Sequence, residues 1–395
     1  MQLNRILSRA LILSALFFFS DQFVFAQLSD LETRCLWIVR ESMYTEEMID
    51  SALIYAYQSG YEIVFVQIRG RGYAFYDSNI VPKHPKIDPD FDPLEYTLKL
   101  GNALGIEVHA WVNTYILWSS KNEPEDYDHL YHTHKEWTES DRNLKMDSQI
   151  KLSEPKSPQW EGIYLSPLHP EVNPYLLSVY SEIINEYNVD GIHLDYIRFQ
   201  DEMYGFNQVG MKMFETIYDI SPRDIARGII STHYGWSQAF VDSIRISWKK
   251  FQQDAVSELV NNTFWAIQQS GKTISLSAAV KPNLLEARHR WNQDWGRWVQ
   301  EGYIDFVVPM NYYKEIRHFN NSVQIMKSNL YAEDIDRIIM GVATYNQDAQ
   351  SAADKILLSR LNGFKGVSIF SYDSHKNNLE WFLPVTDALG MSRYD

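Results

Sequence analysis

The stretch GIHLDYIRFQ, residues 191–200, places three ionisable side chains in a run that otherwise has the composition of a buried strand. An ionised group buried without a partner is strongly unfavourable, so His193, Asp195 and Arg198 must either satisfy one another or line a hydrated site. A carboxyl group whose pKa is raised by partial burial can protonate a leaving oxygen near neutral pH. Asp195 is therefore our candidate for a general acid. The alternative is a structural ion pair between Asp195 and Arg198.

Eight short β-branched or apolar runs predict strands. They are 34–39, 63–69, 106–113, 191–197, 274–280, 304–311, 338–343 and 367–372. Segments with helical periodicity lie between most of them. Examples are 45–59, 92–103, 172–186, 243–269, 293–300, 352–361 and 377–388. Strand–helix units repeated eight times predict an α/β fold, a (β/α)8 TIM barrel.

The two faces of the predicted strands differ in polarity. In 191–195, Ile192 and Leu194 alternate with the polar residues named above, and the strand at 106–113 alternates in the same way. This pattern is expected when apolar side chains pack under helices and polar side chains face the barrel lumen. A doubly wound sheet would instead have two apolar faces.

Two long connections interrupt the repeat, 114–170 after the third strand and 199–241 after the fourth. Both are rich in Tyr, Asp, Glu, His and Pro. Connections of this length in a compact domain are usually functional, so we expect them to form the walls of a cleft. No linker-like tract divides the chain, and we predict a single domain over 27–395.

Nearly every predicted strand ends in a polar or aromatic side chain, at the face where barrel enzymes collect their reactive groups. Donors there would bind hydroxyls and aromatic faces would stack on sugar rings, so the pattern predicts a cleft for a polyhydroxylated ligand. We expect His193 to hold a hydrogen bond below the site, and Arg69 either to bind substrate or to pair with a lumen carboxylate. The candidate substrate contacts are Arg69, His109, Trp111, Asn113, His193, Arg198, Asn311, Tyr312 and Tyr372.

Most glycosidases need a second carboxylate, and spacing alone does not identify one here. Glu41 and Asp373, at the ends of the first and last strands, are the further catalytic candidates, and Asp201, Glu202 and Asp294 are also eligible. If the substrate carries an N-acetyl group at C2, that group can itself attack the anomeric carbon. A second enzymic carboxylate would then not be required.

The N-terminus predicts export. Arg5 and Arg9 precede the apolar run 10–19, and Val24-Phe25-Ala26 offers a cleavage site before Gln27. We therefore expect residues 1–26 to be a signal peptide and the mature chain to be periplasmic or extracellular. We expect no membrane span, because no later segment is long and apolar enough.

Composition restricts the partners and cofactors. The formal net charge of −15 argues against nucleic acid as a partner. His129, His132 and His134 lack a further ligand in sequence and are interpreted as structural or solvated, so no metal or other cofactor is expected. The sequence does not indicate the oligomeric state.

Five blocks occur in order along the chain: VQIRGRGYAFYDS, FDPLEYTLKLGNALGIEVHAWVN, YLSPLHPEV, YNVDGIHLDYIRF and WVQEGYIDFVVPMNYY. Together they resemble the glycosyl hydrolase-like family 10 proteins. The resemblance runs from about residue 34 to 313. It implies a (β/α)8 barrel of an exported bacterial family that includes a hydrolase of peptidoglycan glycan strands.

The resemblance also implies roles for single residues. Asp195 matches the acid of the fourth strand, and Asn113 and Arg69 match cleft positions. Asp294, with Trp298, matches a recurrent Asp-x-x-x-Trp pattern, so Asp294 joins the candidate substrate contacts. Met310 and Gln200 depart from the pattern of the family beside the expected cleft.

Together these observations predict an exported glycoside hydrolase that cleaves O-glycosidic bonds in a bacterial glycan, with Asp195 as the acid. N-acetylated peptidoglycan strands or a related polysaccharide are the expected substrate. One alternative is a non-catalytic glycan-binding barrel. Another is a metal-dependent polysaccharide deacetylase that uses His193 and Asp195.

Overall fold

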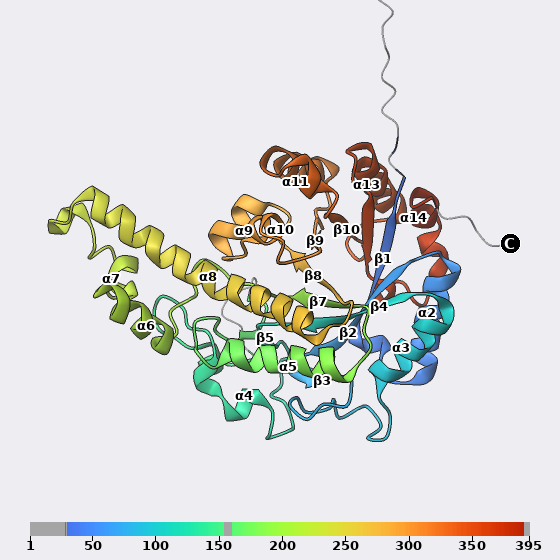
Figure 1. Ribbon diagram of the computed structural model, residues 1–395, viewed down its shortest axis with the longest axis horizontal. Helices are drawn as coiled ribbons and strands as arrows, with labels where there is room; N and C mark the ends of the chain where they lie inside the picture. Colours follow the sequence, from blue (N-terminus) through green and yellow to red (C-terminus); the bar gives the residue numbers. More distant parts are fainter. Residues whose placement is uncertain (1–27, 29, 154–159, 391–395) are drawn as a thin grey trace, which may run out of the picture.

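Eight parallel strands form a nearly closed barrel in the computed structural model (Figure 1). The structure describes residues 28, 30–153 and 160–390, so the predicted signal peptide lies outside the described residues. Around the barrel the strands are β10 (Ile339–Ala343), β11 (Gly366–Phe370), β1 (Thr33–Ile38), β2 (Ile63–Gly70), β4 (Glu107–Asn113), β7 (Gly191–Asp195), β8 (Ser275–Val280) and β9 (Phe306–Pro309). Isolated parallel bridges, Val307 with Ile338 and Met310 with Gly341, join β9 to β10 and close the ring. The predicted TIM-barrel fold is confirmed.

Helices surround this barrel (Figure 1). They include α2 (Glu46–Gln58), α3 (Pro93–Leu104), α5 (Val172–Glu186), α8 (Gln238–Ser270), α9 (Leu284–Arg290), α10 (Trp295–Gln300), α11 (Ile316–Asn329), α13 (Ala349–Leu361) and α14 (Leu383–Ala388). Local sequence sets their ends. The Asp92 side chain accepts a hydrogen bond from the Glu95 amide at the start of α3, and Gly105 takes the left-handed conformation at its end.

The two faces of the strands pack differently, as the alternation predicts. Val64, Val66 and Ile192 belong to the large core cluster that includes the helices. The lumen holds a separate cluster of aromatic and aliphatic side chains that includes Trp37 and Phe65. The polar side chains at the strand ends lie directly above this lumen cluster.

The two long connections are ordered insertions. The first carries a two-stranded antiparallel sheet of β5 (Ile116–Trp118) and β6 (Ile163–Tyr164) together with the short helix α4 (Leu130–Thr133). The second carries α6 (Gln208–Tyr218) and α7 (Pro222–Ala226), which lie with the start of α8 in an arm that projects from the barrel (Figure 1). The first insertion contributes directly to the site described below.

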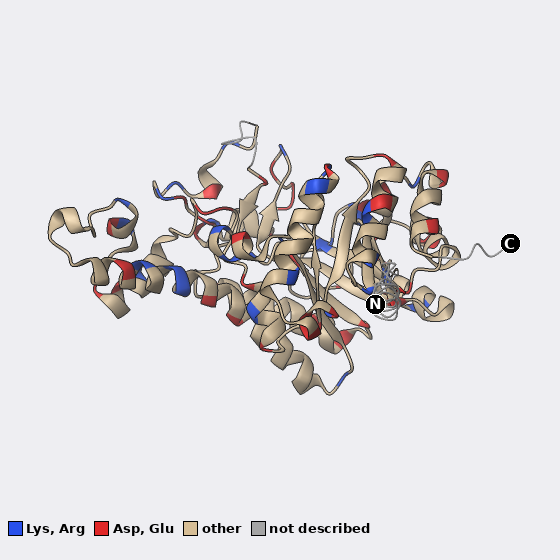
Figure 2. Cartoon of the chain, turned by 90° about the horizontal axis from the view of Figure 1, so that it is seen from above, with Lys and Arg blue, Asp and Glu red and all other residues tan. Residues whose placement is uncertain are grey.

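Charged residues are spread over the outer helices and loops with both signs interspersed (Figure 2). Within the described ranges, no helix combines the length and the apolar character that crossing a membrane requires.

Candidate active site

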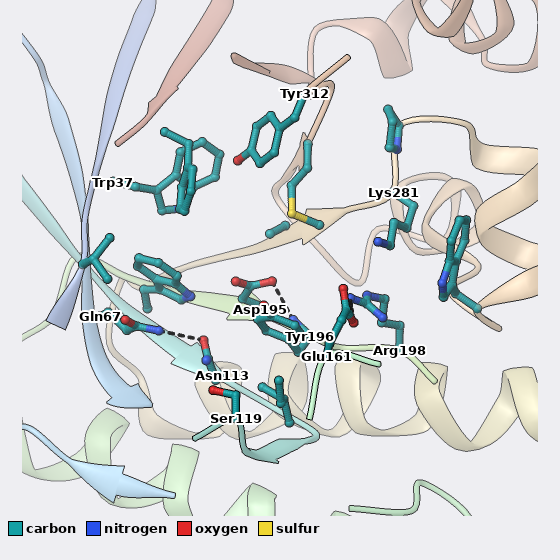
Figure 3. Close-up of a pocket in the computed structure, with 18 of the residues that line it drawn as sticks. Trp37, Gln67, Asn113, Ser119, Glu161, Asp195, Tyr196, Arg198, Lys281 and Tyr312 are labelled. Atoms are coloured by element: carbon teal, nitrogen blue, oxygen red, sulfur yellow. Dashed lines mark hydrogen bonds and ion pairs between the residues drawn. The ribbon is translucent and has the colours of Figure 1, made fainter. Parts of the chain in front are cut away.

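A cleft of about 590 Å³ opens at the carboxyl ends of the barrel strands. This volume is in the range of small-molecule binding sites. The residues that line it include Trp37, Arg40, Gln67, Trp111, Asn113, Ser119, Glu161, Asp195, Tyr196, Arg198, Lys281, Glu286, Trp291, Tyr312, Tyr345 and Phe370 (Figure 3). The cleft therefore combines carboxyl groups, cations and aromatic surfaces.

Asp195 is the last residue of β7, and its carboxyl group lies in the cleft although the residue is only 8% exposed. The chain turns sharply after it, with a positive φ of 52° at Tyr196, and the Tyr196 amide donates to Asp195 Oδ1 at 2.7 Å. Burial raises the pKa of Asp195 to about 6, and the nearby charge of Glu161 adds to this effect. The amide of Tyr196 and the charge of Arg198 oppose it. A pKa near 6 suits a group that donates a proton in mildly acidic or neutral solution.

Arg198 forms its ion pair with Glu161 and not with Asp195. Arg198 Nη2 lies 2.7 Å from Glu161 Oε2, and the Arg198 side chain is 2% exposed whereas that of Glu161 is 36% exposed. The structural ion pair between Asp195 and Arg198, considered from sequence, is therefore absent among the ion pairs of the described residues. Glu161 keeps an accessible carboxylate at the edge of the cleft.

Glu161 has the opposite titration behaviour to Asp195. Burial disfavours its ionised form, but the charges of Arg198 and Lys281 and the hydrogen bonds from Tyr164 and Arg198 outweigh burial and lower its pKa. Two carboxyl groups in one cleft, one with a raised and one with a lowered pKa, are the arrangement in which one acts as an acid and the other as a base or nucleophile. Sequence reasoning missed Glu161 because it lies in the first insertion and not at a strand end.

Lys281 follows β8 and brings an ammonium group to the same cleft (Figure 3). Its Nζ lies over the ring of Trp291, 4.7 Å from the centroid. Burial, together with the charge of Arg198, lowers the pKa of Lys281 to about 8.

Aromatic rings form one wall of the cleft. Tyr312 stacks on Phe370 with centroids 5.4 Å apart, and it meets Trp37 and Tyr345 edge-on at 6.4 and 6.2 Å. Each ring is therefore held by its neighbours, and 58% of the Tyr345 surface remains exposed. Rigid aromatic faces of this kind can stack on a sugar ring.

Polar side chains at the ends of β2 and β4 complete the opposite wall. Gln67 donates to Asn113 Oδ1 at 3.1 Å and accepts from Arg40 at 3.1 Å. Of the residues predicted from sequence, the structure brings five together in the cleft, namely Asp195, Trp111, Asn113, Arg198 and Tyr312.

The other predicted contacts in the barrel interior do not line the cleft. Arg69 is completely buried and donates to the carbonyl groups of Asn113 and Thr114, so it fixes the end of β4. A β-bulge between Gln67 and Arg69 moves Arg69 out of the lumen alternation, which explains the error.

His109 and His193 are also completely buried. His193 Nε2 accepts from Trp37 Nε1 at 3.2 Å, and its Nδ1 lies 2.9 Å from Ser277 Oγ. Burial, with the charge of His109, holds the pKa of His193 well below its usual value. His193 therefore supports Trp37 from below, as expected, but we withdraw both histidines as direct substrate contacts.

Five further candidates lie outside the cleft lining. Asp373 accepts from the Val39 amide at 2.7 Å and from Ser42 Oγ at 2.6 Å, so it ties the end of β1 to the loop after β11. Glu41 is 46% exposed and pairs with Arg40 at 2.9 Å, and Asp294 precedes α10 and pairs with Arg288 at 3.4 Å. Asn311 donates to the Phe319 carbonyl at 3.0 Å, and Tyr372 packs on Tyr55. Position at a strand end did not predict where four of these side chains point, and the Asp-x-x-x-Trp pattern did not place Asp294 in the cleft.

His129 and His132 of the first insertion contact the backbone, and His129 Nε2 also lies 2.8 Å from the carbonyl of Arg71, which follows β2. His129 Nδ1 accepts from the Tyr131 amide at 3.0 Å, and the His132 ring lies 2.8 Å from the Pro124 carbonyl. Within residues 30–153 and 160–390, no group of three or more His, Cys, Asp or Glu side chains is arranged to hold a metal ion.

An eight-stranded parallel barrel with a carboxyl pair in an aromatic cleft has the architecture of the barrel glycoside hydrolases. Comparison with known sequences agrees with this class. The chain belongs to the Glycosyl hydrolase-like 10 family, whose sequence model matches residues 32–357.

The chain is similar to two proteins named glycosyl hydrolases. Glycosyl hydrolase DigH of Escherichia coli K12 is 23% identical over 304 residues, which cover 69% of this chain and 59% of DigH. Glycosyl hydrolase YngK of Bacillus subtilis is 22% identical over 359 residues, which cover 85% of this chain and 64% of YngK. The matched part thus spans about three fifths of the length of these relatives.

Among solved structures, the glycoside hydrolase domain of PgaB (BpsB) from Bordetella bronchiseptica is similar in fold. It superposes with a TM-score of 0.65 at 11% sequence identity, over 90% of this chain and 98% of that domain. At this identity the likeness concerns the fold alone.

Proposed function

We propose that this protein is an exported glycoside hydrolase that cleaves an O-glycosidic bond in a bacterial glycan. Asp195 is the general acid and Glu161 is the ionised second carboxylate. The observation that carries the proposal is the placement of two carboxyl groups in one cleft, with Glu161 paired to Arg198 at 2.7 Å and Asp195 buried at the end of β7. In agreement with this geometry, burial raises the pKa of Asp195 to about 6, and the charge of Arg198 helps to lower the pKa of Glu161. The signal peptide predicted at residues 1–26 supports a periplasmic or extracellular location.

The reaction begins with proton transfer from Asp195 to the glycosidic oxygen of the leaving sugar. Positive charge develops at the anomeric carbon as the bond breaks. Glu161, held ionised by Arg198, either attacks this carbon or takes a proton from an attacking water. With an N-acetylated substrate, the acetamido oxygen can attack instead, and Glu161 then orients and polarises that group. Where Glu161 or the acetamido oxygen has bonded to the anomeric carbon, a water deprotonated by Asp195 then displaces that oxygen and completes the hydrolysis.

Peptidoglycan glycan strands are the first substrate to test. The resemblance of the five sequence blocks to a family with a peptidoglycan glycan-strand hydrolase supports this choice, and so does the aromatic wall of Trp37, Tyr312 and Tyr345. The test incubates the mature chain with N-acetylated strands free of stem peptides, and measures new reducing ends and product masses.

Matched variants make the test specific. We expect Asp195→Asn and Glu161→Gln each to lower the rate by at least about 100-fold, because each removes one partner of the acid–base pair. Glu41→Gln is the control, because Glu41 is an exposed carboxylate near the cleft that does not line it. Wild-type activity in both Asp195→Asn and Glu161→Gln would reject the proposal.

A non-catalytic glycan-binding barrel is the second candidate, favoured by the rigid aromatic stack of Tyr312 on Phe370. It predicts that wild type binds the strands without forming new reducing ends. The deacetylase alternative requires His193 to bind a metal with Asp195. The burial of His193 between Trp37 and Ser277 disfavours that role.

A further inference from the structure

Lys281 is a cation of the cleft whose ammonium acts on Glu161 and Asp195 through its charge but is held by neither of them in an ion pair. Asp195 accepts a hydrogen bond from the Tyr196 amide, and in the described part of the chain the Lys281 ammonium forms neither an ion pair nor a hydrogen bond. The other charged groups that line the cleft are each paired, Arg198 with Glu161 at 2.7 Å, Arg40 with Glu41 at 2.9 Å and Glu286 with Arg290 at 3.4 Å.

The position of Lys281 is fixed by its surroundings. Its backbone amide donates to Gln293 at 2.8 Å and its carbonyl accepts from Trp295 Nε1 at 3.0 Å. The ammonium rests over Trp291 and points into the cleft, on the side of Glu161 and Asp195 (Figure 3). A half-buried ammonium held in this way gains most from an anionic acceptor supplied by a ligand.

The surroundings of Lys281 favour a ligand group that carries a single negative charge. The helix α9 begins two residues after Pro282, but Asn283 accepts from the first free amides, of Leu285 and Glu286, at 3.2 Å each. These two amides are therefore not available to bind a phosphate group. The carboxylate of Glu286 also lines the cleft and repels a second negative charge on a ligand.

We propose that Lys281 binds a carboxylate carried by a sugar beside the scissile bond, so that the substrate is an acidic glycan. This inference rests on the proposed function and names its substrate class. The lactyl carboxylate of N-acetylmuramic acid and the carboxylate of a uronic acid present the same chemistry. A bound carboxylate would also favour the protonated form of Lys281, whose pKa is lowered to about 8 mainly by burial.

The test measures binding by calorimetry in an Asp195→Asn background, so that it does not depend on turnover. The probes are glycan strands of alternating N-acetylglucosamine and N-acetylmuramic acid, with the lactyl carboxylates free or converted to amides. Oligosaccharides of alternating N-acetylglucosamine and glucuronic acid, free or carboxyl-reduced, form the second arm. Chitin oligosaccharides of equal length give the neutral reference.

We expect at least one free acid to bind about 10- to 100-fold more tightly than its neutral form, and the arm with the larger ratio identifies the source of the carboxylate. The ratio of the affinity for the free acid to the affinity for its neutral form should fall to about 1 in Asp195→Asn/Lys281→Met. It should persist in Asp195→Asn/Lys281→Arg. Lys249→Met is the matched control, because Lys249 is a half-buried lysine of α8 outside the cleft.

Equal binding of free acids and their neutral forms, or a ratio that survives Lys281→Met, overturns the inference. If the wild type cleaves chitin oligosaccharides without preferring either acid, the inference fails and the proposed function stands. If no glycan is bound or cleaved, both fail.

Discussion

The guanidinium of Arg198 lies 2.7 Å from the carboxylate of Glu161, although Asp195 is only three residues from Arg198 in sequence. This pairing gives the two carboxyl groups different pKa values. Glu161 receives the stabilising charge and stays ionised, whereas Asp195, buried at the end of β7, holds its proton up to about pH 6. The predictions below follow from that difference.

The rate of glycan cleavage should depend on pH in a bell shape. Ionisation of Asp195 removes the acid, so kcat/KM should fall as pH rises through about 6. Protonation of Glu161 should cause the fall on the acid side, below the usual pKa of a glutamate. Initial rates from pH 3.5 to 8.5 test this. A rate that stays constant from pH 5 to 8.5 would contradict the assignment of Asp195.

Replacing Arg198 should shift the acid limb of that profile. In Arg198→Gln the pKa of Glu161 loses the guanidinium charge and should rise, so the acid limb moves to higher pH and kcat/KM near pH 5 falls about 10- to 100-fold. Arg198→Lys retains the charge and should preserve more of the activity. If Arg198→Gln lowers the rate equally at every pH, Arg198 does not act through the ionisation of Glu161.

The stability of the protein should report the burial of Asp195. Because the folded-state pKa is raised, the folded state binds more protons than the unfolded state between about pH 4 and 6, and stability from this group is lost as pH rises through about 6. The full difference is about 3 kcal/mol. Asp195→Asn should therefore raise the free energy of unfolding by up to about 3 kcal/mol at pH 8 and by little at pH 3.5.

Urea unfolding of wild type and Asp195→Asn at the two pH values measures this difference. Glu41→Gln serves again as the control, since its exposed side chain should give no comparable gain at pH 8. An equal gain from Asp195→Asn at both pH values would show that it does not arise from ionisation.

The barrel could be predicted from the sequence because its signal is local. Alternation with a period of two residues assigned the lumen face of β4 and β7, and placed Trp111, Asn113 and Asp195 correctly. The same alternation failed at Arg69, because a β-bulge after Gln67 pairs Arg69 with Val112, a residue of the outer core. A bulge of one residue leaves no periodic trace in so short a strand.

Glu161 could not be predicted because its position depends on distant contacts. It precedes β6, which pairs with β5 more than 40 residues earlier, and Arg198 and Tyr164 then hold its carboxylate. No sequence motif within residues 114–170 indicates this arrangement. The ion pair with Arg198 explains why the second carboxylate comes from an insertion, whereas the search from sequence was directed at strand ends.

His193 should prove to be a supporting residue and not a reacting one. It is completely buried, and its ring accepts a hydrogen bond from Trp37 and contacts Ser277. His193→Ala removes these hydrogen bonds and leaves a cavity, so it should lower the free energy of unfolding by about 2–4 kcal/mol. Burial keeps the histidine neutral in the folded protein, whereas the unfolded chain protonates it below about pH 6.5, so the loss should be smaller at pH 5.5 than at pH 8, by about 1 kcal/mol. The variant should also retain the midpoints of the pH–rate profile while its rate falls through displacement of Trp37. A midpoint that shifts or disappears in His193→Ala would instead place the imidazole among the groups that exchange protons during the reaction.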